Sequence, residues 1–189
     1  MKTLSLWQPW ATLMALGLKK IETRSWPTRY RGPLAIHAAL EYDTQPPEIL
    51  VNVVIGAIHA TFPSIDLPSL KDWMILRRAC LQFKMDKLPR GGIIAVVDLI
   101  DCVEITKHNH PASPEWEYGD YTPGRFMWIT ENIKPLRKII PFRGRHGLFN
   151  VPDEALRVCR ACGCSEFNAC EGGCSWVEED LCNNPVCIA

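Results

Sequence analysis

The sequence predicts an α+β fold, a small mixed β-barrel with flanking helices that is followed by a small, metal-stapled C-terminal tail. Three observations predict it: short strand-like segments rich in Ile and Val, Gly and Pro turns between them, and cysteines concentrated at one end. Interspersed strands with few helices favour a barrel over a doubly wound parallel sheet. The 189 residues suffice for one domain and a short tail. We expect these at residues 1–150 and 157–189.

The first elements are marked by proline, glycine and alternation. The run Pro9–Leu16 begins with Pro and is followed by Gly17, which predicts a short helix. Residues Lys19–Ser25 alternate in polarity, as a strand with one polar face does. After a Pro/Gly turn, Pro33–Ala39 is expected to form a second strand.

The remaining elements of the body follow from the same signals. Two segments look helical and lie on either side of a proline-punctuated stretch: Gln45–Phe62 and Ser69–Lys84. A long apolar strand, a polar loop and two final strands are expected in this order: Ile93–Ile105, His108–Gly124, Phe126–Glu131 and Lys134–Pro141.

The tail is too short to fold without a crosslink. Seven of the nine cysteines lie in the last 31 residues, and so short a segment cannot bury enough apolar surface to offset its conformational entropy. The N-terminal segment lacks the features of a signal peptide, and no apolar run is long enough to span a membrane. We therefore expect a cytoplasmic protein with reduced thiols, which favours metal over disulfides.

Zinc is the expected metal, in a structural role. Two cysteine pairs, Cys159-x2-Cys162 and Cys182-x4-Cys187, have the spacing of one tetrahedral site. The other three thiols could hold a second metal together with a bridging cysteine, or replace members of this set: Cys164, Cys170 and Cys174. An iron–sulfur cluster or a disulfide staple remains the alternative.

Charge separates the two parts of the chain. The net charge is zero, but residues 151–189 hold two basic and seven acidic side chains, so that the tail carries −5 and the body +5. A modestly basic body is compatible with a polyanionic partner. The acidic tail is better suited to packing on the body or to meeting a protein partner.

The N-terminal segment carries a family signature. Residues 4–39 read LSLWQPWATLMALGLKKIETRSWPTRYRGPLAIHAA, and G-x-K-x-x-E-x-R is met by Gly17, Lys19, Glu22 and Arg24. The segment resembles the opening of an ASCH domain, a member of the PUA-like superfamily, and residues 124–151 resemble its closing strands. The likeness covers about residues 1–150. The tail resembles a cysteine-rich C-terminal module of bacterial and phage proteins.

The resemblance implies nucleic-acid binding, with RNA expected and single-stranded DNA as the alternative. Glu22 and Arg24 share a strand face, so that the carboxylate can orient the guanidinium toward a phosphate or a base edge. We expect Lys19 and Arg24 to contact the ligand and Trp26 to offer a stacking surface, because aromatic rings beside cations suit single strands.

A hydrolase is the main alternative. Some small members of the family are amidohydrolases that act on modified cytidine, in which Lys acts beside a Thr three residues later. In this chain that position is Glu22, so the hydroxyl nucleophile is missing, and Thr23 is expected to face the other way. If the chain is an enzyme, Lys19 and Glu22 are therefore the main catalytic candidates, as an acid–base pair acting on a modified nucleoside or nucleotide.

Two further features are secondary candidates. His37 lies on a predicted strand, where a lone histidine is more often structural than catalytic. A basic stripe near the end of the body is compatible with either a charged surface or phosphate tracking: Arg137, Lys138, Arg143, Arg145 and His146. A third functional class, an adaptor whose tail recruits a partner protein, is also open.

Overall fold

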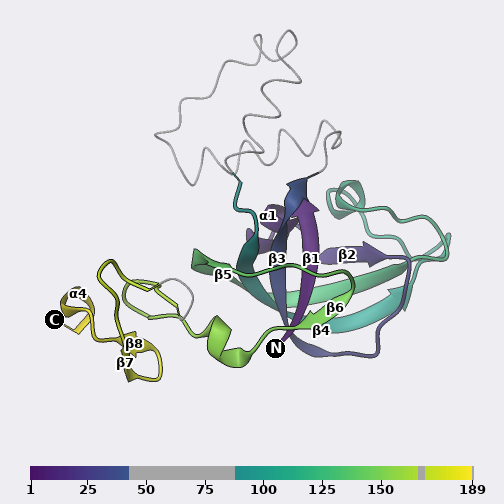
Figure 1. The fold of residues 1–189 in the computed structure, drawn as a ribbon. Helices are drawn as coiled ribbons and strands as arrows, with labels where there is room; N and C mark the ends of the chain where they lie inside the picture. Colours follow the sequence, from purple (N-terminus) through teal and green to yellow (C-terminus); the bar gives the residue numbers. More distant parts are fainter. Residues whose placement is uncertain (43–87, 166–168, 189) are drawn as a thin grey trace, which may run out of the picture.

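The computed structural model describes residues 1–42, 88–165 and 169–188. In these ranges the chain is mostly β-sheet with few helices (Figure 1). The two predicted helices at Gln45–Phe62 and Ser69–Lys84 lie outside the described residues.

One six-stranded sheet forms the body, with the strand order β2-β5-β4-β3-β1-β6. The strands are β1 (Lys2–Gln8), β2 (Ile21–Arg24), β3 (Gly32–Tyr42), β4 (Gly92–Glu104), β5 (Phe126–Pro141) and β6 (Leu148–Asn150). Strands β1 and β3 are parallel and every other pair is antiparallel, so the sheet is mixed, as predicted. Figure 1 shows the sheet strongly curved, so that the long strands β4 and β5 run across the direction of β1 and β3.

The helix α1 (Trp10–Ala15) forms where the sequence predicts it. Pro9 stands at its N-cap, and Gly17, whose φ of 74° is costly for any residue with a β-carbon, follows its end. Five of the six helical residues are buried. The helix packs against the sheet through Ala11, Met14 and Ala15, which belong to the main hydrophobic core.

Strand β5 replaces two predicted strands. Phe126–Glu131 and Lys134–Pro141 are joined into one strand, because the ladder between β4 and β5 absorbs Asn132 and Pro135 at irregular positions. Asn132 adopts a φ of 50°, and Pro135 lies where the register with β4 shifts. Strands β1 and β6 were not predicted.

The core lies inside the curved sheet. Trp128 on β5 is fully buried and packs with residues of β1, β3, β4 and α1. The polar loop predicted at His108–Gly124 contains a short 3-10 helix, η1 (Glu115–Tyr118), whose Tyr118 is buried. This loop covers the start of β2 and thereby contributes to the site described below.

The tail contains a second, two-stranded sheet. A 3-10 helix, η2 (Asp153–Leu156), leads from the body to the hairpin of β7 (Trp176–Glu178) and β8 (Leu181–Cys182), and α4 (Pro185–Ile188) follows. A separate core forms around cysteine side chains and Leu181. Figure 1 shows this unit to one side of the six-stranded sheet. Among the described helices, none is long and apolar enough to cross a membrane.

Candidate functional site

The carboxylate of Glu22 links two cations of the signature. Its Oε1 lies 3.2 Å from Nε of Arg24, and its Oε2 lies 3.4 Å from Nζ of Lys19. Lys19 precedes β2, so strand alternation does not separate it from Glu22, as it would inside the strand. The structure thus has the carboxylate–guanidinium pair expected from the sequence, and adds the ammonium group to it.

Lys19 is placed differently from the expectation that it contacts a ligand. Its side chain is 1% exposed, and Nζ donates hydrogen bonds to the main-chain oxygens of Ile21 at 2.5 Å and Tyr118 at 2.7 Å. With Glu22, these groups occupy the three donors of the ammonium group. Lys19 therefore acts here as an internal brace between β2 and η1.

Arg24 is held from two sides and still reaches solvent. Nη2 donates to the main-chain oxygen of Ser5 at 2.9 Å, while Nε faces Glu22. The side chain is 26% exposed, which leaves part of the planar guanidinium group available to a ligand. Of the two expected ligand-contacting cations, Arg24 alone is accessible in this structure.

Arg24 lines an open cleft of about 920 Å³. One wall comes from β1, β2 and β3, and the other comes from residues 142–147, after β5. The cleft brings the signature and part of the basic stripe together although about 120 residues separate them. Its basic side chains are Arg24, Arg125, Arg143, Arg145 and His146.

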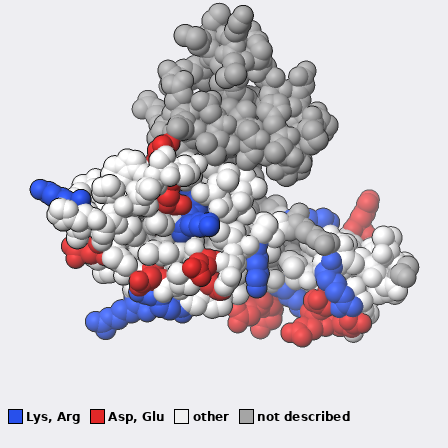
Figure 2. All heavy atoms as spheres, turned by 180° about the vertical axis from the view of Figure 1, so that it is seen from behind, with Lys and Arg blue, Asp and Glu red and all other residues white. Residues whose placement is uncertain are grey.

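The far wall supplies unpaired positive charge. Arg143 and Arg145 are exposed, and no acidic partner of either is found within residues 1–42, 88–165 and 169–188. Arg125 differs, because its Nε lies 3.3 Å from Asp120. On the face shown in Figure 2, which is seen from behind, basic and acidic side chains of the described residues are interspersed.

The tryptophan rings of the cleft are those of Trp7 and Trp10, and the expected Trp26 is not among them. Trp7 is 53% exposed. Trp26 packs edge-on against the core residue Trp128, with 4.6 Å between ring centroids, and is absent from the cleft lining. Stacking surface is therefore available on β1 and not at the predicted position after β2.

His37 joins the two walls. Its Nε2 faces the main-chain oxygen of Phe142 at 2.9 Å, and because a carbonyl can only accept, this nitrogen carries the hydrogen. Nδ1 is then the acceptor for the hydroxyl of Ser5 at 3.1 Å. Burial lowers the pKa of His37 and favours this neutral form. The histidine is a hydrogen-bonded bridge, as the sequence favours.

Sequence reasoning missed Ser5, and placed Trp7 beside the signature without selecting it as the stacking surface, because β1 was not predicted. The signal was present: in Leu4-Ser5-Leu6-Trp7 the two leucines are buried and the alternate positions line the cleft. Reading that alternation as a strand would have placed both residues on one face.

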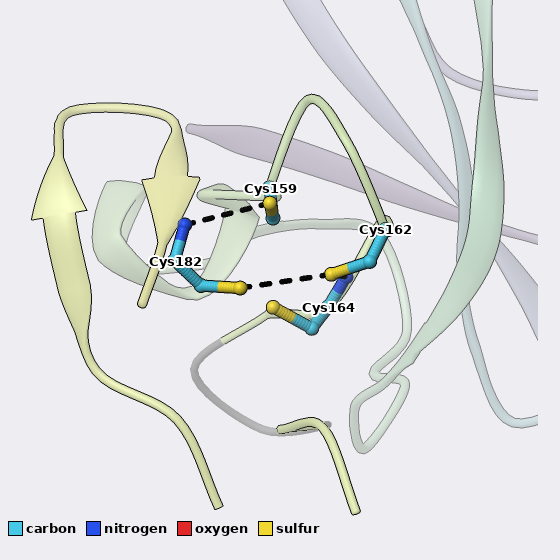
Figure 3. Close-up of side chains that lie close together, drawn as sticks. All are labelled: Cys159, Cys162, Cys164 and Cys182. Atoms are coloured by element: carbon cyan, nitrogen blue, oxygen red, sulfur yellow. Dashed lines mark hydrogen bonds between the residues drawn. The ribbon is translucent and has the colours of Figure 1, made fainter. Parts of the chain in front are cut away.

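The tail thiols gather into two sets that could each hold a metal ion. One set is Cys159, Cys162, Cys164 and Cys182, and the other is Cys164, Cys170, Cys174 and Cys182. In each set the four sulfur atoms lie within 4.8 Å of one another. Figure 3 shows the first set, with three of the sulfurs close together and Cys159 above them. Donation from the backbone N–H of Cys164 lowers the pKa of Cys162 to about 5, toward the thiolate that a metal binds.

Three of the four cysteines expected to bind one metal ion lie together in the first set. Cys164 joins Cys159, Cys162 and Cys182, whereas Cys187 is in neither of the two sets. Cys187 nevertheless packs against the cysteine core of the tail, which includes Cys159 and Cys182. All seven tail thiols therefore belong to one connected cluster.

Comparison with known proteins identifies the body. The model of the ASCH domain family matches residues 4–139. Activating signal cointegrator 1 of Homo sapiens is 31% identical over 141 residues, which are 75% of this chain and 20% of that protein. The Mus musculus protein of the same name is 30% identical over the same shares. The chain thus spans about one fifth of the length of these relatives. The tail lies beyond the matched residues. The family match covers most of the body and includes the whole signature, so this chain belongs to the ASCH domain family.

Proposed function

We propose that the chain binds single-stranded nucleic acid, with RNA as the preferred form, in the cleft between β1–β3 and residues 142–147. The observation that carries the proposal is that one cleft combines the exposed Trp7 ring with exposed Arg143 and Arg145, which have no acidic partner among the described residues. Guanidinium groups that follow a phosphate backbone and a ring on which bases stack are the two components of single-strand sites.

The three charged residues of the signature each have a role in this proposal. Arg24 contacts a phosphate or a base edge, because Glu22 and the Ser5 carbonyl fix its plane and leave other donors free. Glu22 orients Arg24. Lys19 balances the charge of Glu22 from the interior and positions it without touching the ligand.

The other functional classes have less support. Neither the family description nor the names of the relatives refers to hydrolysis, and the Lys19 ammonium group has no access to the cleft. The relatives are named as cointegrators, which is compatible with an adaptor role that uses the acidic tail. We further propose that a structural zinc site holds the tail together, since a closed set of four thiolates leaves no position for a substrate.

The test is a salt titration of binding to labelled single-stranded RNA. Each neutralised phosphate contributes about 0.7 to the slope of log K against log salt for single strands. The variant Arg143→Ala/Arg145→Ala should therefore lower the slope by about 1.4. The matched control Lys107→Ala/Lys134→Ala removes the same charge from exposed positions outside the cleft, and its slope should stay within about 0.3 of the wild type.

Two outcomes would overturn the proposal. One is an absence of binding at low salt, and the other is an equal loss of slope in the cleft variant and the control. The same titration with single-stranded DNA of identical sequence tests the preference for RNA, because only a contact to the 2′-hydroxyl distinguishes the two backbones. Equal affinities would reject that preference and leave the cleft assignment intact.

A further inference from the structure

The sulfur atoms of the tail are spaced as metal ligands. Four sulfur–sulfur distances are 3.6 Å (Cys162–Cys170), 3.7 Å (Cys162–Cys182), 3.6 Å (Cys164–Cys174) and 4.0 Å (Cys170–Cys182). Ligands about 2.3 Å from a tetrahedral zinc ion lie about 3.8 Å from one another. A disulfide would need sulfur atoms about 2.05 Å apart, and all seven tail cysteines are free thiols.

One ion cannot account for this cluster. A tetrahedral structural site uses four thiolates, and the two sets that could hold a metal together contain six. The seventh thiol, Cys187, packs against the same cysteine core. A single zinc would leave three thiols buried or half-buried in the same core without a structural function.

Two tetrahedral ions have eight ligand positions between them, one more than the seven thiols of the tail. We propose that the tail binds two divalent ions of the zinc class, and that the Cys182 thiolate is shared between them. The first ion takes Cys159, Cys162, Cys182 and Cys187, and the second takes Cys164, Cys170, Cys174 and Cys182. An odd number of cysteines is then fully used.

Cys182 has the position that a bridge requires. It belongs to both four-thiol sets, is completely buried, and lies 3.7 Å from Cys162 of the first site and 4.0 Å from Cys170 of the second. Figure 3 shows its sulfur directed between those of Cys162 and Cys164. Cys164 also occurs in both sets, but its sulfur lies 3.6 Å from that of Cys174, a member of the second set only. Cys187 lies on α4, which contacts the β8 strand that carries Cys182, so it can complete the first site and leave Cys164 to the second.

Backbone N–H groups point at the sulfur atoms as in metal–thiolate centres. Cys164 N lies 3.5 Å from Sγ of Cys162, Cys170 N lies 3.3 Å from Sγ of Cys174, and Cys182 N lies 3.5 Å from Sγ of Cys159. Such donors stabilise the charge on the ligands. Seven thiolates and two divalent ions carry −3 in total. Sharing one ligand therefore gives a smaller negative charge than two separate four-thiolate sites would have. Each ligating thiol releases its proton on binding.

The experiment measures metal stoichiometry on the full chain by native mass spectrometry and elemental analysis. The wild type should hold two zinc ions per chain. Cys187→Ser and Cys174→Ser remove a ligand of the first and the second ion, so each should retain one ion. Cys102→Ser, which removes a free thiol of the body, is the control and should retain two.

The bridge is tested on the wild type, because Cys182→Ser alone could prevent folding of the tail. With cadmium-113 in place of zinc, a shared sulfur should give two NMR resonances with scalar coupling between them. One ion per chain, two uncoupled resonances, full retention by Cys187→Ser, or iron with acid-labile sulfide would each overturn the proposal. The outcome is independent of nucleic-acid binding in the cleft.

Discussion

Gly144 lies directly against His37. A β-carbon on Gly144 would stand 2.5 Å from Cε1 of His37 and 3.0 Å from Oγ of Ser5. The contact seats the segment 142–147 on β1 and β3 and so fixes the distance between the two walls of the cleft. The hydrogen bond from His37 to the Phe142 carbonyl acts in the same direction.

Gly144→Ala should displace this wall. Overpacking at so close a contact costs about 1–3 kcal/mol, so we expect a lower free energy of unfolding in urea and weaker RNA binding. The double variant His37→Ala/Gly144→Ala removes the ring that the new methyl group meets. It should be less destabilised than the sum of the two single variants, and simple additivity would contradict the contact.

Stability should fall at acidic pH because of His37. Burial lowers the pKa of His37, so between its native pKa and about 6.5 the unfolded chain binds more protons than the native one. Stability therefore rises with pH in this window and is lost as pH falls below about 6.5. Urea midpoints at several pH values should show a smaller decline in His37→Gln than in the wild type. His108→Asn, at an exposed loop position, should decline as the wild type does.

Lys19→Met separates a positioning role from ligand contact. The variant leaves the buried carbonyls of Ile21 and Tyr118 without their donor, and each such loss costs about 1–3 kcal/mol. We expect reduced stability in urea with an unchanged salt slope of RNA binding. Arg24→Ala serves as the comparison, because it should reduce that slope by about 0.7. A similar reduction in Lys19→Met would show that its ammonium group reaches a phosphate.

Metal removal should unfold the tail and spare the body. The small core of the tail is built mainly from cysteine side chains, whereas the main core of the body contains no tail residue. After chelation, limited proteolysis should cut within 157–189 and leave a resistant fragment that retains Val151 and Ala155, which belong to a core of the body. The NMR signal of the buried Trp128 indole should be retained as the reporter of the body. Loss of that signal with the metal would show that the two parts fold as one unit.

The sequence was sufficient where local signals agree with tertiary packing. Pro9 and Gly17 delimit α1, and alternation around Glu22 and Arg24 correctly gives their shared face. It was insufficient to predict where the side chains of Lys19 and Trp26 lie. Lys19 is buried against η1 and Trp26 packs on Trp128, and both partners are about 100 residues away in the chain. The cleft itself could not be predicted, since no local pattern places Arg143 opposite Arg24.

The metal cluster illustrates the same limit. Spacing alone selected Cys159, Cys162, Cys182 and Cys187, and three of these lie in one four-thiol set. The inclusion of Cys164 follows from the turn at Gly163, whose φ is 70° and which brings the thiols on either side of it together.

Only one of the two walls of the cleft lies within the residues that the family model matches. The wall that carries Glu22 and Arg24 lies inside the family match, whereas Phe142 to Gly147 follow its last residue, 139. A change confined to these six residues would leave the signature and the Lys19 brace intact. Exchanging this one segment between two members would alter one wall of the cleft and keep Arg24 and Trp7 on the other. The segment can therefore be tested separately from the motif by which members are recognised.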